Sequence, residues 1–118
     1  MSDRRNALGA AGESAVATWY EAAGYAVLDR NWRCRGGELD LVLGRGRTIV
    51  FCEVKTRRSD AFGIPAEAVT PRKQRRVRGL AVAWLAERGM RGDLRFDVAS
   101  VRPASGGVLA VEVLEAAF

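Results

Sequence analysis

Two apolar, β-branched runs separated by a short glycine-containing segment constrain the fold of this chain more than any other feature. The runs cover residues 38–43 and 48–56, and residues 44–47 lie between them. Alternating side chains on both sides of such a segment are typical of a β-hairpin. If Gly46 and Arg47 are the central turn residues, Arg45 faces Thr48, and the register of the whole hairpin follows.

This register predicts one apolar face and one charged face. The apolar layer would consist of Leu39, Leu41, Leu43, Val50, Cys52 and Val54. On the other face, Asp40 would lie opposite Glu53, and Glu38 would lie opposite Lys55. Two facing carboxylates repel each other, so they need either a cation between them or solvation by water. Oxygen ligands without histidine or cysteine nearby favour Mg²⁺ or Mn²⁺ over zinc.

The chain contains no histidine, which excludes imidazole bases and imidazole metal ligands. Lys55 would share a face with Glu53, where its ammonium would orient a water molecule and stabilise a pentavalent phosphate. Glu13, in the first predicted helix, would reach the same site and add a ligand. The alternative is a solvated sheet face on which Lys55 neutralises nearby acids.

The rest of the chain predicts one α/β domain over residues 1–118. The spacing of Leu8, Ala11, Ala15, Trp19 and Ala22 predicts a helix over residues 6–23 with that stripe buried. Strands are expected at 25–32, 94–101 and 108–114, and a basic turn at 33–37. Thr70 and Pro71 begin a second helix that Gly89 ends. The order helix, three strands, helix, two strands favours a mixed sheet covered on both faces.

Basic residues flank the acidic strands, and the net charge of the chain is +5. The candidate nucleic-acid-binding residues are Arg33, Arg35, Arg57, Arg72, Lys73, Arg75 and Arg76. Cations near a carboxylate–metal site would neutralise phosphates on both sides of a scissile bond. A bound anion would also relieve the unfavourable positive charge at the start of the second helix. The alternative is a solvated, arginine-rich helix face.

The polar N-terminus and the lack of long apolar runs predict a cytoplasmic protein. No apolar run approaches the ~20 residues of a membrane span, and no signal-peptide core follows residue 6. The two cysteines, Cys34 and Cys52, lack metal-ligand spacing, and the expected state is a pair of reduced thiols.

Two segments of the chain resemble the signature of the YraN-type family. They are Gly-Gly-Glu-Leu-Asp-Leu-Val at 36–42 and Val-Phe-Cys-Glu-Val-Lys-Thr-Arg at 50–57. Further matches to its pattern are Gly12-Glu13, Arg30-Asn31, Phe62-Gly63, Lys73 and Arg95-Phe96-Asp97. This is a family of small, largely uncharacterised bacterial proteins that is similar to archaeal Holliday-junction resolvases. The resemblance covers essentially the whole chain.

The resemblance implies a restriction-endonuclease-like fold with a PD-(D/E)XK nuclease site. By position, Asp40 and Glu53 would be metal ligands, Lys55 the catalytic lysine, and Glu13 the helix-borne acid. Leu39 stands where the motif often has proline. The expected function is Mg²⁺- or Mn²⁺-dependent cleavage of DNA, with a homodimer implied by analogy with resolvases. Two alternatives remain open on the same fold: a non-catalytic nucleic-acid-binding module and a protein-interaction module.

Overall fold

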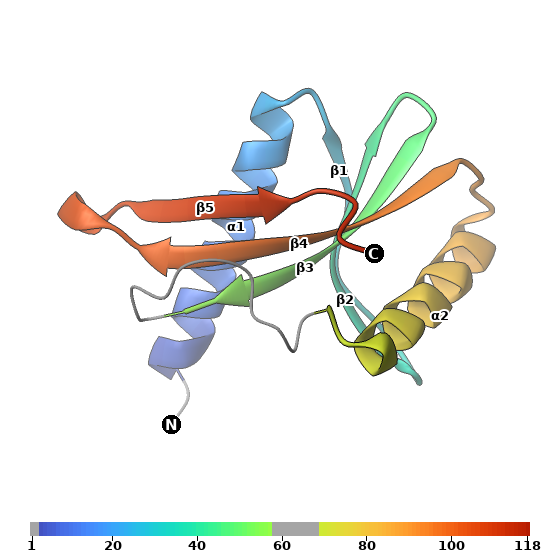
Figure 1. The fold of residues 1–118 in the computed structure, drawn as a ribbon, viewed down its shortest axis with the longest axis horizontal. Helices are drawn as coiled ribbons and strands as arrows, with labels where there is room; N and C mark the ends of the chain where they lie inside the picture. Colours follow the sequence, from blue (N-terminus) through green and yellow to red (C-terminus); the bar gives the residue numbers. More distant parts are fainter. Residues whose placement is uncertain (1–2, 58–68) are drawn as a thin grey trace.

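The computed structural model describes residues 3–57 and 69–118, with side chains described from residue 7 onward. Phe62 and Gly63, which match the family pattern, lie outside this part of the chain. In chain order the elements are α1 (Asp3–Ala22), β1 (Ala26–Cys34), β2 (Gly37–Arg45), β3 (Thr48–Thr56), α2 (Pro71–Arg88), β4 (Asp93–Pro103), a short 3-10 turn η2 (Ser105–Gly107) and β5 (Leu109–Leu114) (Figure 1). The predicted order of helices and strands is confirmed.

The five strands form one mixed sheet in the order β1-β2-β3-β4-β5. Neighbouring strands are antiparallel except β3 and β4, which are parallel and are connected through α2. The predicted mixed α/β sheet is therefore confirmed. None of the described helices is both long enough and apolar enough to cross a membrane.

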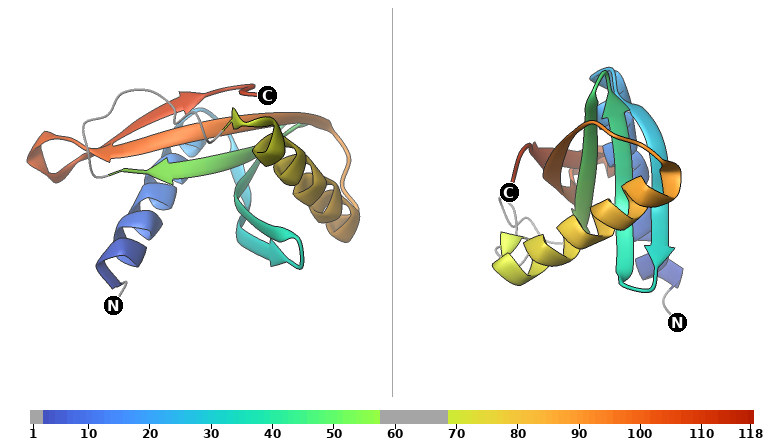
Figure 2. Two further views of the ribbon diagram at one scale, coloured as in Figure 1. Left: turned by 60° about the horizontal axis from the view of Figure 1, so that its bottom comes forward. Right: turned by 90° about the vertical axis from the view of Figure 1, so that its right-hand side faces the viewer.

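The two helices cover opposite faces of this sheet (Figures 1 and 2). Successive side chains of a strand point to opposite faces, so β3 contributes to two separate cores. Val50 and Cys52 pack with buried residues of α1, whereas Ile49 and Phe51 pack with buried residues of α2. By the same alternation, Glu53 and Lys55 of β3 lie on the face that α2 covers.

The buried face of α1 differs from the predicted stripe. Val16, Ala17 and Tyr20 are fully buried, whereas Ala11 and Ala22 of the predicted stripe are exposed. The stripe prediction was wrong because alanine fits either face of a helix, so it does not fix the rotation of α1. The side chain of Tyr20 does fix it, because its hydroxyl has a buried partner on the sheet.

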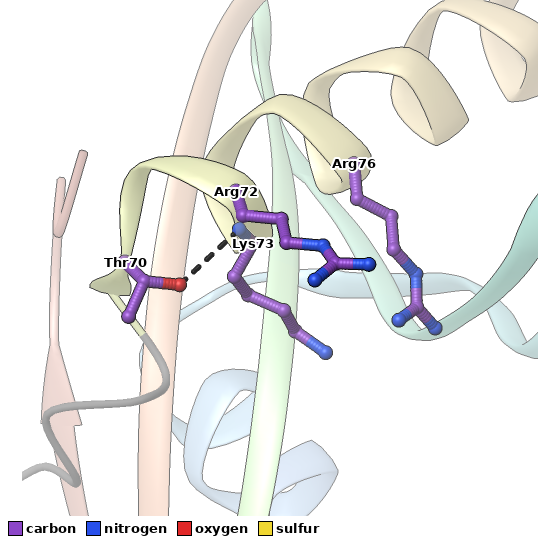
Figure 3. Close-up of a pocket in the computed structure, with 4 residues that line it drawn as sticks. All are labelled: Thr70, Arg72, Lys73 and Arg76. Carbon is purple, nitrogen blue, oxygen red and sulfur yellow. Dashed lines mark hydrogen bonds between the residues drawn. The ribbon is translucent and has the colours of Figure 1, made fainter.

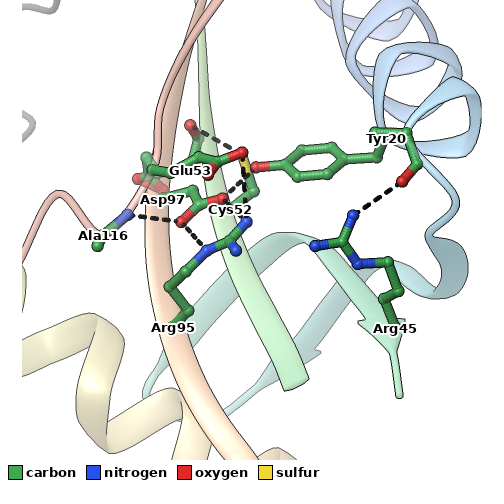
Figure 4. Close-up of polar contacts among 9 residues, drawn as sticks. Tyr20, Arg45, Cys52, Glu53, Arg95, Asp97 and Ala116 are labelled. Carbon is green, nitrogen blue, oxygen red and sulfur yellow. Dashed lines mark hydrogen bonds and ion pairs between the residues drawn. The ribbon is translucent and has the colours of Figure 1, made fainter. Parts of the chain in front are cut away.

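That partner belongs to a buried network centred on Asp97 in β4 (Figure 4). The Tyr20 hydroxyl donates to Asp97 Oδ2 at 2.6 Å. Arg95 donates from Nε and Nη2 to the two carboxylate oxygens, both at 2.9 Å, and the Ala116 N–H donates to Oδ1 at 3.0 Å. Burial, as the largest cause, raises the pKa of Tyr20 far above its usual range, so the hydroxyl stays a donor. The network fixes α1 and the C-terminal segment against β4.

The register predicted for the central hairpin is confirmed over most of its length. Leu43 pairs with Val50 and Arg45 pairs with Thr48, so Gly46 and Arg47 are the central turn residues, as predicted. The prediction for Leu39 was wrong, because Leu39 packs in the cluster on the α2 side. The N-terminal part of β2, before Leu41, does not pair with β3 and pairs only with β1.

The β1–β2 hairpin therefore extends past β3 and runs alongside α2 (Figures 1 and 2). β1 reaches Cys34, so the turn is shorter than the predicted segment 33–37. Hydrogen bonds from Trp84 and Arg88 of α2 to Asp29, and from Trp32 to Glu87, connect the hairpin to the helix. These contacts set the position of α2 relative to the acidic strands.

The predicted ends of α2 are confirmed. Thr70 Oγ1 accepts a hydrogen bond from the Lys73 N–H at 3.3 Å, and Pro71 occupies the first helical position. Gly89 ends the helix with φ of 63°, a left-handed conformation that favours glycine.

Candidate functional site

Asp40 and Glu53 come together at the point where β2 separates from β3. The last pair of the β2–β3 ladder is Leu41 with Cys52. Beyond it, the Val54 N–H donates to Asp40 Oδ2 at 2.8 Å, so a side chain replaces the backbone carbonyl of a regular ladder. The two predicted carboxylates therefore lie on neighbouring strands, although they do not form a ladder pair.

The electrostatics of Asp40 reflect this crowding of acids. Burial, and secondly the charge of Glu53, raise the pKa of Asp40 to about 7. The hydrogen bond from Val54 acts in the opposite direction, and Glu13 and Glu38 raise the pKa further. A carboxyl group with such a pKa is only partly ionised at neutral pH, and a nearby cation would favour its ionised form.

Glu13, in α1, interacts electrostatically with two of these acids, Asp40 and Glu38. It is half-buried, and burial is the largest cause of its raised pKa. A hydrogen bond with the Asn31 side chain lowers the pKa, the charge of Glu38 raises it, and Arg30 lowers it. The charge of Glu13 also contributes to the raised pKa of Asp40, so both belong to one group of acids.

Asn31 is a member of this group to which the sequence reasoning assigned no role. It lies in β1 with φ of 50°, a left-handed conformation that Asn adopts more readily than most residues. The available signals were its residue type and its match, together with Arg30, to the family pattern. Neither its conformation nor its contact with Glu13 follows from them.

Gly12 allows α1 to approach the end of β3. A Cβ atom at Gly12 would lie 2.2 Å from Thr56 Oγ1 and 3.3 Å from Thr56 Cβ and Cγ2. Thr56 directly follows Lys55, so this close approach sets the distance between the helix that carries Glu13 and the strand that carries the lysine.

Gly12→Ala is expected to lower the free energy of unfolding by about 1–3 kcal/mol, because the added methyl group has no space. Gly9→Ala, in the same helix, is the matched control. An added Cβ there meets nothing within 4 Å, so it should stabilise the protein by about 0.5–1 kcal/mol through helix propensity. Urea unfolding followed by circular dichroism measures both variants. Equal stability of the two variants would show that the contact with Thr56 is not tight.

Two lysines lie on or near the acidic strands, in different situations. Lys73 Nζ lies 2.8 Å from Glu53 Oε2, and both side chains are largely buried. Lys73 was predicted to bind nucleic acid, and the structure also gives it this ion pair. Lys55 follows Glu53 on the same face of β3, is half-buried, and makes no ion pair within the described residues.

The predicted pairing of Glu38 with Lys55 was wrong. Glu38 Oε2 instead accepts a hydrogen bond from Arg33 Nε at 2.7 Å, across the β1–β2 hairpin. The reason is again that β2 leaves β3 beyond Leu41, so Glu38 has no position opposite β3.

Three of the predicted nucleic-acid-binding residues line one pocket of about 220 Å³ at the start of α2 (Figure 3). The residues that line it are Thr70, Arg72, Lys73 and Arg76. The tip of the β1–β2 hairpin adjoins this pocket, because a Cβ atom at Gly37 would lie 3.2 Å from Arg76 Nε. Cationic side chains and the acidic strands therefore meet around Lys73.

The other predicted nucleic-acid-binding residues are dispersed. Arg75 is exposed on α2 and does not line the pocket. Arg33 binds Glu38, and Arg35 is exposed in the turn between β1 and β2. Arg57 follows β3 and is half-buried. The predicted basic surface is thus divided between a pocket and isolated positions.

Residues 12–101 match the model of a family described as "Uncharacterised protein family UPF0102". This segment contains Glu13, Asp40, Glu53, Lys55 and the whole basic pocket. The chain belongs to the UPF0102 family. The resemblance of its signature segments to the YraN-type family is thereby confirmed at the level of family membership.

Relatives within the UPF0102 family match this chain over nearly its full length. A UPF0102 protein of Frankia casuarinae is 50% identical over 115 residues, which cover 97% of this chain and 98% of the relative. One from Beutenbergia cavernae is 50% identical over 111 residues, covering 93% and 94%. One from Geobacter sulfurreducens is 44% identical over 118 residues, covering 99% and 92%.

The donor set of this UPF0102 protein suits a hard divalent cation, but the acids do not form a closed cage. Asp40, Glu53 and Glu13 offer only carboxylate oxygens, which Mg²⁺ and Mn²⁺ prefer. Within residues 7–57 and 69–118, no three acidic or thiol side chains converge closely enough to hold an ion. Lys73 instead supplies the positive charge beside Glu53, so an ion that binds both strands would have to replace that ammonium.

Proposed function

We propose that this UPF0102 protein is a metal-dependent nuclease with a restriction-endonuclease-like fold that hydrolyses phosphodiester bonds in DNA. The observation that carries the proposal is the position of Asp40 and Glu53, two crowded carboxylates on neighbouring strands, with Lys55 on the same strand face as Glu53. The raised pKa of Asp40 supports it, because such a carboxyl group gains the most from a bound cation.

In the proposed mechanism, Asp40 and Glu53 would hold Mg²⁺ or Mn²⁺, and Glu13 would supply a further carboxylate. The bound ion would polarise the phosphate and a water molecule. Lys55 would orient the attacking water and stabilise the negative charge that develops on the phosphate. The cations at the start of α2 would hold the DNA backbone through its phosphates.

A cleavage assay on duplex, single-stranded and branched DNA, with Mg²⁺ or Mn²⁺, tests the proposal. Asp40→Asn and Lys55→Met are expected to reduce the rate by about 100-fold or more, with DNA binding retained at low salt. Arg91→Ala, an exposed charge change away from the site, should cleave like the wild type. The absence of cleavage with any substrate and either metal would refute the catalytic role, as would full activity of Lys55→Met.

A second candidate is a non-catalytic nucleic-acid-binding module. The ion pair between Lys73 and Glu53 favours it, because the site already neutralises one carboxylate without a metal. This function predicts salt-sensitive DNA binding that is indifferent to Mg²⁺ and to Lys55→Met.

The resolvase-like form of the proposal includes a homodimer, because symmetric cleavage of two strands needs two sites. Light scattering on the purified protein, alone and with branched DNA, measures the oligomeric state directly. A protein that stays monomeric on branched DNA would exclude symmetric cleavage while leaving hydrolysis of single strands open.

A further inference from the structure

The pocket at the start of α2 is lined by three cationic side chains and one hydroxyl group. Figure 3 shows Arg72, Lys73 and Arg76 extending from one side of the helix, with Thr70 at its end. Arg75 is an equally basic neighbour that does not line the pocket. Three of the basic residues at the start of this helix therefore line the same pocket, whereas Arg75 does not.

Within the residues that the structure describes, the positive charge in this pocket is only partly neutralised. Lys73 is paired with Glu53, whereas neither Arg72 nor Arg76 makes a hydrogen bond or ion pair with another described residue. The first turn of α2 carries no acidic residue. Positive charge at a helix N-terminus interacts unfavourably with the helix dipole. A bound anion would offset this interaction and the repulsion among the cations.

Side chains, more than the backbone amides of the helix end, would provide the binding groups. Thr70 already uses its hydroxyl oxygen on the Lys73 N–H and its carbonyl on the Gln74 N–H. Pro71 has no N–H to offer. Beside the Arg72 N–H, the donors are two guanidinium groups and the Lys73 ammonium that also pairs with Glu53. Guanidinium groups match the oxygens of a phosphate in bidentate geometry.

The size of the pocket limits what it can hold. About 220 Å³ is below the roughly 300–1,000 Å³ of sites that enclose whole cofactors or drug-sized ligands. The space suits one small anionic group with its water, and the rest of a larger ligand would lie outside it.

We propose that Arg72, Lys73 and Arg76 form a binding site for a single phosphate group. The group is either a backbone phosphodiester or a terminal phosphate monoester of a nucleic acid, so this inference rests on and sharpens the proposed function. Lys73 belongs to this site and also pairs with Glu53 at 2.8 Å, so a phosphate bound there would lie beside the acidic strands. The pocket would thereby fix which phosphate of the substrate adjoins the carboxylates.

The test uses inorganic phosphate and, separately, a short DNA duplex with or without a 5′-phosphate. Backbone amide shifts of the full chain are followed by NMR while phosphate replaces chloride at constant ionic strength. Shifts are expected at residues 70–76. Arg72→Ala/Arg76→Ala should weaken phosphate binding by about tenfold or more. Arg47→Ala/Arg91→Ala, which removes the same charge from exposed positions elsewhere, should leave it unchanged.

Equal weakening of phosphate binding in the two double variants would overturn the proposed site and indicate diffuse electrostatic attraction. Amide shifts spread over the whole surface would do the same. Thermal melts of both variants exclude unfolding as the cause. If the pocket variant alone loses affinity for the duplex only when a 5′-phosphate is present, the ligand is a terminal monoester. If it loses affinity for both duplexes, the ligand is a backbone diester.

The two proposals fail separately in this design. Localised binding of inorganic phosphate without any DNA binding would uphold the pocket and reject the nuclease. DNA binding that the pocket variant retains in full would reject the pocket and leave the nuclease standing.

Discussion

Replacing Asp97 with alanine is expected to lower the free energy of unfolding by about 3–5 kcal/mol. The carboxylate is fully buried and accepts hydrogen bonds from Tyr20, from Arg95 and from the Ala116 N–H. Its removal leaves a partly buried guanidinium and a fully buried hydroxyl without their partner. Because Tyr20 fixes the rotation of α1, we also expect weaker packing of the helix that carries Glu13.

Asp93→Ala is the matched control for this prediction. Asp93 belongs to the same strand, but it is exposed, and its contact with Arg47 is 3.9 Å long. Such surface pairs contribute about 0–1 kcal/mol. Urea unfolding at constant pH compares the two variants. If the free energies of unfolding of the two variants differed by less than about 1 kcal/mol, the Asp97 network would not stabilise the fold as we infer.

Asp40→Asn is expected to stabilise the protein at pH 8, in contrast to most changes at a half-buried position. Burial and Glu53 raise the pKa of Asp40 from 3.8 to about 7 in the folded protein. Between these values the folded state binds more protons than the unfolded state, so wild-type stability falls as pH rises. Asparagine cannot ionise, and its carbonyl oxygen can still accept from the Val54 N–H.

Thermal melts in EDTA from pH 5 to pH 8 measure this effect. The Tm of Asp40→Asn should exceed that of the wild type by about 5 °C or more at pH 8, and the difference should shrink toward pH 5. Asp93→Asn, the same change at an exposed position, should show no such trend. A pH-independent difference would mean that Asp40 does not carry the raised pKa.

Thermal melts with Mg²⁺ in place of EDTA test metal binding without any assay of activity. An ion that binds the folded protein raises its Tm by mass action. We expect this increase for the wild type at pH 8 and not for Asp40→Asn. An equal increase in both proteins would place the bound ion elsewhere.

The sequence predicted those parts of the site that depend on local geometry. The turn at Gly46 and the alternation of side chains fixed the hairpin register, and the ladder from Arg45 to Leu41 confirms it. Beyond Leu41 the prediction failed for Leu39 and for Glu38. The path of β2 is set there by pairing with β1 and by contacts with α2, which are distant in the sequence and leave no periodic signal.

The contacts made by the helices were the least predictable part. The alanine-rich sequence of α1 fits more than one rotation, and only the buried partner of Tyr20 decides between them. The ion pair of Lys73 with Glu53 depends on where the crossover helix lies over the sheet. Capping residues indicate where a helix starts, but they do not indicate which strand its side chains reach.

The parallel pairing of β3 with β4 has a consequence for the order of folding. β1, β2 and β3 pair through short turns. Thr48 can pair with Asp93 only after the two ends of the long segment between β3 and β4 have come together. Closing a long segment costs chain entropy before its contacts form, which slows the step. We therefore expect the three-stranded meander to form early, so that the acidic strands exist before β4 and the helix that neutralises Glu53 have docked.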